Sequence, residues 1–485
     1  MTTLIHQATI VNEGEQYVGS VLIENQCIAT IIRGTDISAV SADCLVDARG
    51  QYLIPGCIDD HVHFRDPGLT QKADMHTESR AAARGGVTSV MDMPNCNPQT
   101  ITIDALEAKF ADARDKCIVN HSFYLGATTD NIDEIHRVDP RTVCGVKLFM
   151  GSSTGGMLVD KDERIETIFR ESPTLIALHC EDQHVISANT AKYKAETMSD
   201  DPDVTYHPLI RSEEACYRST AKAVELARKT GAHIHIMHIS TARELELLQQ
   251  GDVPDKQITA EVCLPHLYYT DADYATYGTR IKCNPAVKSA ADREALRKAL
   301  RDGLIDVVGT DHAPHLLSDK VGGSLKAASG IPTIQYVLPA MLELADRGVF
   351  SLAEVVEKMA HNPAILYKVK GRGFIREGYR ADLVLVKPDA PHTVDAEEIA
   401  SKCAWSPFEG HTFRWDITHT WINGHAVYQE GEFDERYKGE RLLSYRSQSL
   451  HQYIFLPCLG YGTTLCCRGR GARLSVMPCR MGCLI

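Results

Sequence analysis

The stretch Ile54–Gly68, IPGCIDDHVHFRDPG, is the part of the chain from which the fold is most directly predicted. Pro-Gly pairs stand near both of its ends. Between them an apolar segment leads into two histidines one residue apart, His61 and His63, followed by Arg65. Residues i and i+2 of a β-strand share one face. We therefore expect a buried strand whose end directs two imidazoles and a guanidinium at one point.

Downstream of this stretch, short apolar runs alternate with amphipathic segments. The apolar runs are GCIDDHVHF, VTSVMDMP, CIVNHSFYLGA, VCGVKLFM, TLIALHCED, AHIHIMHIS, ITAEVCLPHL and IDVVGTDHAP. Segments between them, such as 104–116, 215–230, 242–250 and 292–303, have the Ala/Glu/Lys/Arg-rich composition of helices. Eight strands alternating with helices predict an α/β fold, the (β/α)8 TIM-like barrel.

The two chain ends have a different pattern from the middle. Residues 1–52 and 370–446 are rich in short alternating segments such as ITHTWINGHAVYQEGEF, which predict antiparallel strands. We expect both ends to form one small β-sandwich domain beside a barrel of residues 53–369.

The last residues, 447–485, have another composition again. They hold five of the 16 cysteines and four arginines, but no Asp, Glu or Lys. A metal-binding or redox appendage is one interpretation. Because the five cysteines show no paired C-x-x-C spacing, we favour a tail that is not part of the fold.

Composition restricts the partners and the location. A net charge of −13 over 485 residues argues against nucleic acid or an anionic membrane as the main partner. No apolar run reaches the roughly 18 residues of a membrane span, and the N-terminus MTTLIHQATIVNEGEQY lacks the features of a signal peptide. We expect a cytoplasmic protein in which scattered cysteines such as Cys57 and Cys180 are buried free thiols.

Polar residues stand where most of the predicted strands end, and in such barrels these ends meet at the face that carries the chemistry. They are His61, His63 and Arg65 after the first strand, Asp92 and Asn95 after the second, Lys147 in the fourth, His179 in the fifth, His238 in the sixth, and Asp311, His312 and His315 in the eighth. Each alone has a bland explanation, since an H-x-H pair arises by chance and an aspartate can cap a helix. Four histidines and one aspartate on one rim predict a metal centre instead.

Neutral imidazoles and a carboxylate are the ligands that Zn²⁺ and similar ions prefer. Five such groups exceed the needs of one open site and suit two ions about 3.5–4 Å apart. Lys147 is the remaining inward candidate for a bridge, but an ammonium ion beside two cations is electrostatically unfavourable. A lysine that has reacted with CO₂ is an anionic carbamate with one oxygen for each ion. We therefore hypothesise that Lys147 is carboxylated.

In combination, DDHVHFRDPG, MDMPNCNP, GVKLFMGSSTGG and GTDHAPH resemble the dihydroorotases of the amidohydrolase superfamily, of the lysine-bridged binuclear type, over residues 1 to about 446. The resemblance implies two Zn²⁺ ions per subunit: His61, His63 and Asp311 at the more buried ion, His179 and His238 at the other, and carboxylated Lys147 with a hydroxide between them. It also implies that the substrate is contacted by His63, Arg65, Asn95, Asn284, His315, Ser329 and Gly330.

The implied reaction is the reversible hydrolysis of L-dihydroorotate to N-carbamoyl-L-aspartate, which runs toward ring closure in de novo pyrimidine biosynthesis. The hydroxide between the metal ions would attack the cyclic amide, with Asp311 as general base and then acid. The planar fork of Arg65 would bind a substrate carboxylate. Beyond this small-molecule substrate, the resemblance suggests a second copy of the chain in a homodimer.

The chain departs from the resemblance at NPAVK, where many relatives have NPPLR, so Lys288 replaces an arginine and its role is open. Allantoinases, hydantoinases and dihydropyrimidinases share the metal ligands, and allantoinase is the closer alternative. A non-catalytic amidohydrolase-like scaffold is the alternative from another class, although all six ligand positions are present. The Gly-rich segment 316–332 is expected either to fold over the site or to be an ordinary mobile loop.

Overall fold

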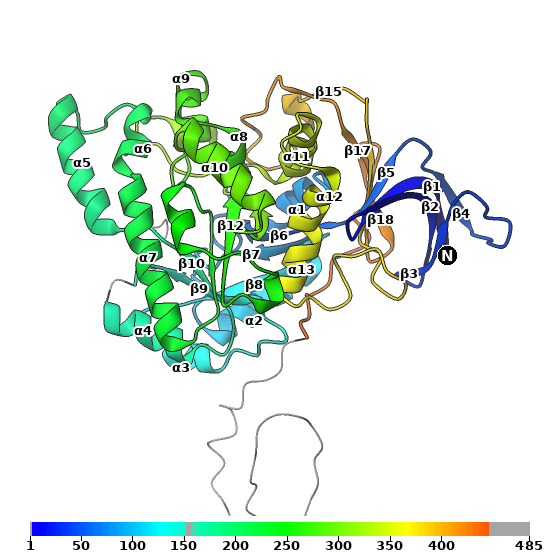
Figure 1. Ribbon diagram of the computed structural model, residues 1–485, viewed down its shortest axis with the longest axis horizontal. Coiled ribbons are helices and arrows are strands. Elements are labelled where there is room, and N and C mark those ends of the chain that lie inside the picture. Colours follow the sequence, from blue (N-terminus) through cyan, green and yellow to red (C-terminus); the bar gives the residue numbers. More distant parts are fainter. Residues whose placement is uncertain (1, 152–156, 160, 446–485) are drawn as a thin grey trace, which may run out of the picture. The chain divides into compact units, whose positions relative to one another are not determined.

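A barrel of eight parallel strands forms the centre of the computed structural model, which describes residues 2–151, 157–159 and 161–445 (Figure 1). The strands are β6 (Cys57–Val62), β7 (Val87–Asp92), β8 (Asn120–Gly126), β9 (Gly145–Phe149), β10 (Ile176–His179), β11 (Ile234–Ile236), β12 (Ile258–Cys263) and β13 (Val307–Gly309). They pair in sequence order. Val62 also bridges to His312 just after β13, which nearly closes the barrel. The predicted (β/α)8 architecture is confirmed, with a strand in each of the eight predicted runs.

Helices connect the strands and surround the barrel (Figure 1). They are α1 (Met75–Arg84), α2 (Ile103–Lys116), α3 (Ile132–His136), α4 (Asp162–Glu171), α5 (Gln183–Thr197), α6 (His207–Ile210), α7 (Glu213–Thr230), α8 (Leu264–Tyr268), α9 (Tyr274–Tyr277), α10 (Ala290–Arg301), α11 (Val337–Asp346), α12 (Leu352–Val356) and α13 (Asn362–Leu366). Sequence signals set several of their starts. The α10 helix, for example, begins at a capping box in which Ser289 and Asp292 each accept a backbone N–H of the other.

One predicted helix is wrong. Residues 242–250 form only the short 3₁₀ turn η2 (Arg243–Leu247). The cause is Glu244, which is buried and whose Oε2 accepts the Thr241 hydroxyl at 2.9 Å and the Thr241 backbone N–H at 3.2 Å. Such local bonds from side chain to backbone compete with a helical ladder.

Strands from both chain ends share one nine-stranded sheet, as predicted for the small β domain. Its strands are β1 (Thr3–Asn12), β2 (Glu15–Glu24), β3 (Cys27–Arg33), β4 (Cys44–Asp47), β5 (Tyr52–Pro55), β14 (Leu383–Lys387), β17 (Asp416–Ile422), β18 (His425–Gln429) and β19 (Glu432–Phe433), with a separate pair of β15 (His392–Thr393) and β16 (Thr412–Phe413). The β5 strand pairs antiparallel with β14 and leads directly into β6. The sheet encloses its own core, which includes Ile10, Leu53 and Trp421.

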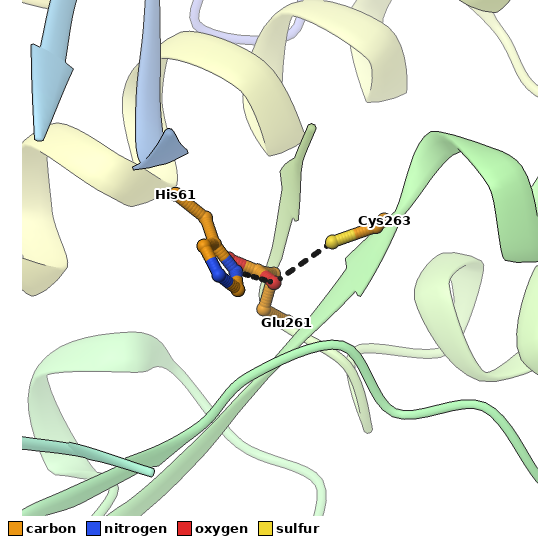
Figure 2. A group of neighbouring side chains, drawn as sticks. All are labelled: His61, Glu261 and Cys263. Carbon is orange, nitrogen blue, oxygen red and sulfur yellow. Dashed lines mark hydrogen bonds and ion pairs between the residues drawn. The ribbon is translucent and has the colours of Figure 1, made fainter. Parts of the chain in front are cut away.

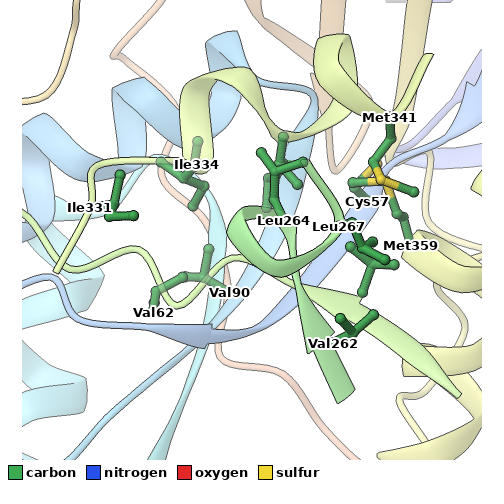
Figure 3. Packing of buried hydrophobic residues seen from close by; sticks show 14 of the residues in the cluster. Cys57, Val62, Val90, Val262, Leu264, Leu267, Ile331, Ile334, Met341 and Met359 are labelled. Carbon is green, nitrogen blue, oxygen red and sulfur yellow. The ribbon is translucent and has the colours of Figure 1, made fainter. Parts of the chain in front are cut away.

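The main apolar core lies between the barrel strands and the surrounding helices. Figure 3 shows part of it, with Val62, Val90 and Val262 from the strands and Leu264 and Met341 from α8 and α11. All five are at most 2% exposed, and burying each side chain of this kind contributes about 1.5–3 kcal/mol.

The inner face of the strands carries polar residues beside a second apolar cluster that includes Met91, Ala177 and Met237. In β9, Val146 and Leu148 belong to the main apolar core, so Lys147 between them points to the opposite, inner face. None of the helices in the described ranges is long and apolar enough to span a membrane. The predicted tail 447–485 lies outside the described residues.

Candidate metal centre

All six predicted metal ligands line one cavity at the C-terminal ends of the barrel strands. His61 is in β6 and His63 follows it, Lys147 is in β9, and His179 ends β10. His238 and Asp311 stand two residues beyond β11 and β13. The full lining is His61, His63, Arg65, Asn95, Lys147, Phe149, His179, His238, Asn284, Asp311, Ala313, Ser329 and Gly330. The structure therefore brings together every predicted site residue except His315.

His61, His63 and Asp311 bring three hydrogen-bond acceptor atoms close together. His61 Nδ1 donates to Glu261 Oε1 at 3.0 Å (Figure 2), which leaves Nε2 as an acceptor 3.2 Å from Asp311 Oδ1. His63 Nδ1 donates to Asn95 Oδ1 at 2.8 Å, so its Nε2, 3.1 Å from the same Asp311 oxygen, is an acceptor as well. Two lone pairs and a carboxylate that converge in this way fit a bound cation.

A second pair of nitrogens lies beside the first group. His179 Nδ1 is 2.9 Å from His238 Nε2, and the His238 ring centroid is 5.3 Å from that of His61. The other ring nitrogen of His179, Nε2, lies 3.0 Å from the carboxylate of Glu181, which is itself paired with Arg211. A carboxylate at Nε2 favours the tautomer in which Nδ1 is free to bind a metal ion.

Burial places the histidines in the protonation state that binds metals. It lowers the pKa of His61 and of His63 to about 4, and it lowers the pKa of His179 and His238 as well. Neutral imidazoles are therefore present at pH 7. Burial alone would raise the pKa of Asp311, but the neighbouring His61, His63 and Lys147 outweigh it and hold that pKa far below its usual range. Four neutral imidazoles and one carboxylate are a donor set that fits zinc.

Lys147 fits the carbamate hypothesis in its burial and its basicity. Its side chain is fully buried, and Nζ donates to Met237 Sδ at 2.8 Å. No carboxylate in the described part of the chain lies within ion-pair distance of it. Burial lowers the pKa of Lys147 to about 8, so an appreciable fraction is neutral amine near pH 7–8. Only that neutral form is nucleophilic toward CO₂.

Backbone strain marks three of the residues that line the cavity. Arg65, His238 and Asp311 have φ angles of 64°, 41° and 45°, in the left-handed region that non-glycine residues rarely adopt. Such conformations cost about 1–3 kcal/mol each and cluster at functional sites.

Arg65 is buried without a carboxylate partner. The residue is 5% exposed, its Nε donates to the Pro314 carbonyl at 3.1 Å, and its Nη2 lies 3.1 Å from His315 Nε2. None of the ion pairs among the described residues includes Arg65. Burial lowers its pKa to about 10, which leaves the guanidinium charged at neutral pH.

His315 lies behind Arg65 and is not part of the cavity lining. Its Nδ1 is 3.1 Å from Lys72 Nζ, so the ring sits between two cationic groups. Burial, followed by the charges of Arg65 and Lys72, lowers the pKa of His315 to about 2 and keeps it neutral. Its predicted contact with substrate stays a prediction, and its position suggests that it supports Arg65.

The other predicted substrate contacts, Asn95, Asn284, Ser329 and Gly330, all line the cavity. The amide oxygen of Asn284 is buried and has no hydrogen-bond partner in the described structure. An unpaired acceptor at a cavity wall is suited to an N–H of a bound ligand. Asn95 has a further role that the sequence did not indicate, because its oxygen accepts the Nδ1 proton of His63.

Glu261 is a functional candidate that the sequence analysis missed. Its Oε1 accepts His61 Nδ1–H, the backbone N–H of His238 at 2.9 Å and Cys263 Sγ at 3.0 Å (Figure 2). It therefore links both groups of ligands. The available signal was an acidic residue inside the apolar run ITAEVC.

Two polar residues singled out at strand ends are structural instead. Asp92 pairs with Lys109 at 2.7 Å and accepts the backbone N–H of Phe64 at 2.9 Å. His312 Nε2 lies 2.7 Å from the buried carboxylate of Glu78. Both connect the barrel to its surrounding layer.

Comparison with known proteins agrees with this architecture. Residues 52–427 match the profile of the Amidohydrolase family. A dihydroorotase of Halobacterium salinarum is 35% identical over 382 residues, which cover 77% of this chain and 86% of the relative. An allantoinase of Bacillus velezensis is 32% identical over 437 residues, 88% and 94% of the two chains. An L-hydantoinase (dihydropyrimidinase) from Arthrobacter aurescens superposes with a TM-score of 0.86 at 28% identity, covering 91% and 99%.

Proposed function

The chain belongs to the amidohydrolase family, and we propose that within this family it is a zinc-dependent dihydroorotase, which interconverts L-dihydroorotate and N-carbamoyl-L-aspartate. The observation that carries the proposal is Arg65. A guanidinium that is 5% exposed and has no carboxylate partner is costly to maintain unless a ligand supplies the anion. Arg65 lines the same cavity as the candidate metal ligands, so a substrate carboxylate there would lie beside the reacting amide.

His61, His63 and Asp311 would hold one metal ion, His179 and His238 would hold a second, and carboxylated Lys147 would supply a further anionic ligand. When bound, such ions activate a water molecule and polarise an amide carbonyl. Glu261 and Asn95 contribute by accepting the Nδ1 protons of His61 and His63, which fixes the ring orientations.

Asp311 is the candidate for moving the proton. Its depressed pKa keeps it ionised, and its Oδ1 lies between His61 and His63 where the attacking water would be held. It would accept the proton of that water as the new C–O bond forms. It would then deliver the proton to the ring nitrogen as the C–N bond breaks. Asn284 Oδ1 is available to accept a ring N–H of the substrate.

Allantoinase is the second candidate, since the allantoinase relative is aligned over 88% of this chain. Neither allantoin nor hydantoin carries a carboxylate, so with either substrate Arg65 would remain buried without an anionic partner. The environment of Arg65 therefore favours dihydroorotate. A non-catalytic scaffold is disfavoured because all six candidate ligands line the cavity.

The proposal is tested with the purified protein and four substrates. N-carbamoyl-L-aspartate is assayed at mildly acidic pH and dihydroorotate at alkaline pH, with allantoin and hydantoin in parallel. Turnover of the first two alone supports the proposal. Turnover of allantoin or hydantoin without dihydroorotate would leave the cyclic-amide chemistry and overturn the substrate assignment.

A further inference from the structure

Two more buried lysines lie behind the part of the cavity wall that is formed by Asn284, Ser329 and Gly330. Lys282 and Lys320 are each 3% exposed, and neither forms an ion pair with a carboxylate in the described ranges. Lys320 Nζ instead donates to the backbone carbonyls of Lys282 at 3.1 Å, Ala328 at 2.7 Å and Gly330 at 2.9 Å. An ammonium group has three N–H donors, so all three are used on the main chain.

These carbonyls belong to the two segments that carry predicted substrate contacts. Lys282 is two residues from Asn284, and Ala328 and Gly330 flank Ser329. The segments are also joined directly, because the Gly330 backbone N–H donates to the Lys282 carbonyl at 2.9 Å. Lys320 therefore links the segment that contains Lys282 and Asn284 to the segment that contains Ser329 and Gly330.

The position of Gly330 leaves little room for these segments to shift. Its φ is +145°, and a Cβ at this residue would lie 2.5 Å from the Ala313 carbonyl oxygen. Ala313 lines the cavity as well. A change in the spacing around Gly330 would therefore be transmitted to the cavity wall.

The segment that contains Lys320 is anchored at other points too. The carboxylate of Asp201 accepts the backbone N–H groups of Gly323 at 2.7 Å, Leu325 at 2.9 Å and Lys326 at 3.0 Å. Thr279 Oγ1 donates to the Lys320 carbonyl at 2.5 Å. These bonds anchor segment 316–332, which the sequence analysis expected either to fold over the site or to be a mobile loop.

Burial of an ammonium without a carboxylate partner is unfavourable, and it lowers the pKa of Lys320 to about 7 and that of Lys282 to about 8. Both lysines are therefore mostly protonated at mildly acidic pH. We propose that Lys320 is a positioning residue that sets the spacing of Asn284 and Ser329–Gly330 and, together with Lys282 and Arg65, adds positive potential that favours an anionic substrate. The positioning role stands on the contacts alone, whereas the preference for an anion rests on the proposed function. Neither lysine lines the cavity, so both act through the groups that they hold and through their charge.

The test compares Lys320→Met with Lys326→Met, a matched control at an exposed lysine of the same segment. Amide hydrogen exchange is measured on peptides that cover 279–285 and 327–331, and kcat and KM are measured with N-carbamoyl-L-aspartate at mildly acidic pH, where Lys320 is mostly protonated. In Lys320→Met we expect exchange around Gly330 to become at least about tenfold faster and KM to rise about 10- to 100-fold, the usual range for charged hydrogen bonds, with kcat within about threefold. Lys326→Met should change neither.

A second variant covers the case in which Lys320→Met does not fold. Lys320→Gln keeps two N–H donors but no charge, so exchange should rise less while KM still increases. Unchanged exchange in a folded Lys320 variant would overturn the positioning role, and an unchanged KM would overturn the preference for an anionic substrate. If the wild-type protein does not turn over dihydroorotate, the proposed function fails, while the exchange data still decide the positioning role.

Discussion

Replacing Arg65 by methionine removes the guanidinium and keeps a side chain of comparable length at the cavity wall. In the structure, Arg65 is held by the Pro314 carbonyl and by His315, and it has no carboxylate partner of its own. We expect the substrate carboxylate to take that place. Hydrogen bonds to charged groups contribute about 1.5–3 kcal/mol each, and a guanidinium binds a carboxylate through one or two of them. The loss is therefore about 1.5–6 kcal/mol, or roughly 10- to 20,000-fold in kcat/KM.

The assay measures kcat/KM of wild type and Arg65→Met for dihydroorotate and for an uncharged cyclic amide such as dihydrouracil. The control is Arg114→Met, since the Arg114 side chain is 74% exposed on α2 and pairs only with the equally exposed Asp115 among the ion pairs of the described residues. We expect the full loss for dihydroorotate, less than about threefold for the uncharged amide, and unchanged metal content. An equal loss for both substrates, or a loss below about threefold for dihydroorotate, would refute the assignment of Arg65 as the carboxylate-binding group.

Three further predictions concern the ligands and the fold. Glu261→Gln replaces the carboxyl group that accepts the Nδ1 proton of His61 and should weaken metal binding about 10- to 100-fold in chelator competition; unchanged affinity would contradict the role of Glu261. Lys147→Ala should bind fewer than two metal ions and lose the ¹³C carbamate signal obtained after labelling with ¹³C-bicarbonate, whereas two ions with full activity would exclude the bridge. The ion pair with the Glu398 carboxylate raises the pKa of His392, so its stabilisation is complete below the unfolded pKa of about 6.5 and is lost as pH rises through the folded value. His392→Asn should thus lower urea stability by up to about 1 kcal/mol at pH 5.5 and by nothing at pH 9, and an equal effect at both values would reject this sign.

The barrel and most of the candidate site could be predicted from sequence because both follow from strand periodicity. A strand places alternate residues on opposite faces, so Lys147 between Val146 and Leu148 had to point inward. The C-terminal ends of parallel strands meet at one face, so His179 and Asp311 were expected to be neighbours although they are far apart in the chain.

The remaining parts of the site depend on distances that no sequence pattern encodes. Glu261 lies inside a strand and not at its end, and its role is visible only because His61 and the His238 backbone reach the same oxygen. The supporting position of His315 behind Arg65, and the contacts of Lys320 with three carbonyls, likewise arise from loops whose paths local propensities do not determine.

The central claim is tested most directly by a crystal structure of the protein with zinc and N-carbamoyl-L-aspartate. We predict two zinc ions, one at His61, His63 and Asp311 and one at His179 and His238, with a carbamate on Lys147 between them. A ligand carboxylate should lie within about 3.2 Å of the Arg65 guanidinium. A ligand whose carboxylates avoid Arg65, or a cavity in which these histidines bind no zinc, would contradict the account.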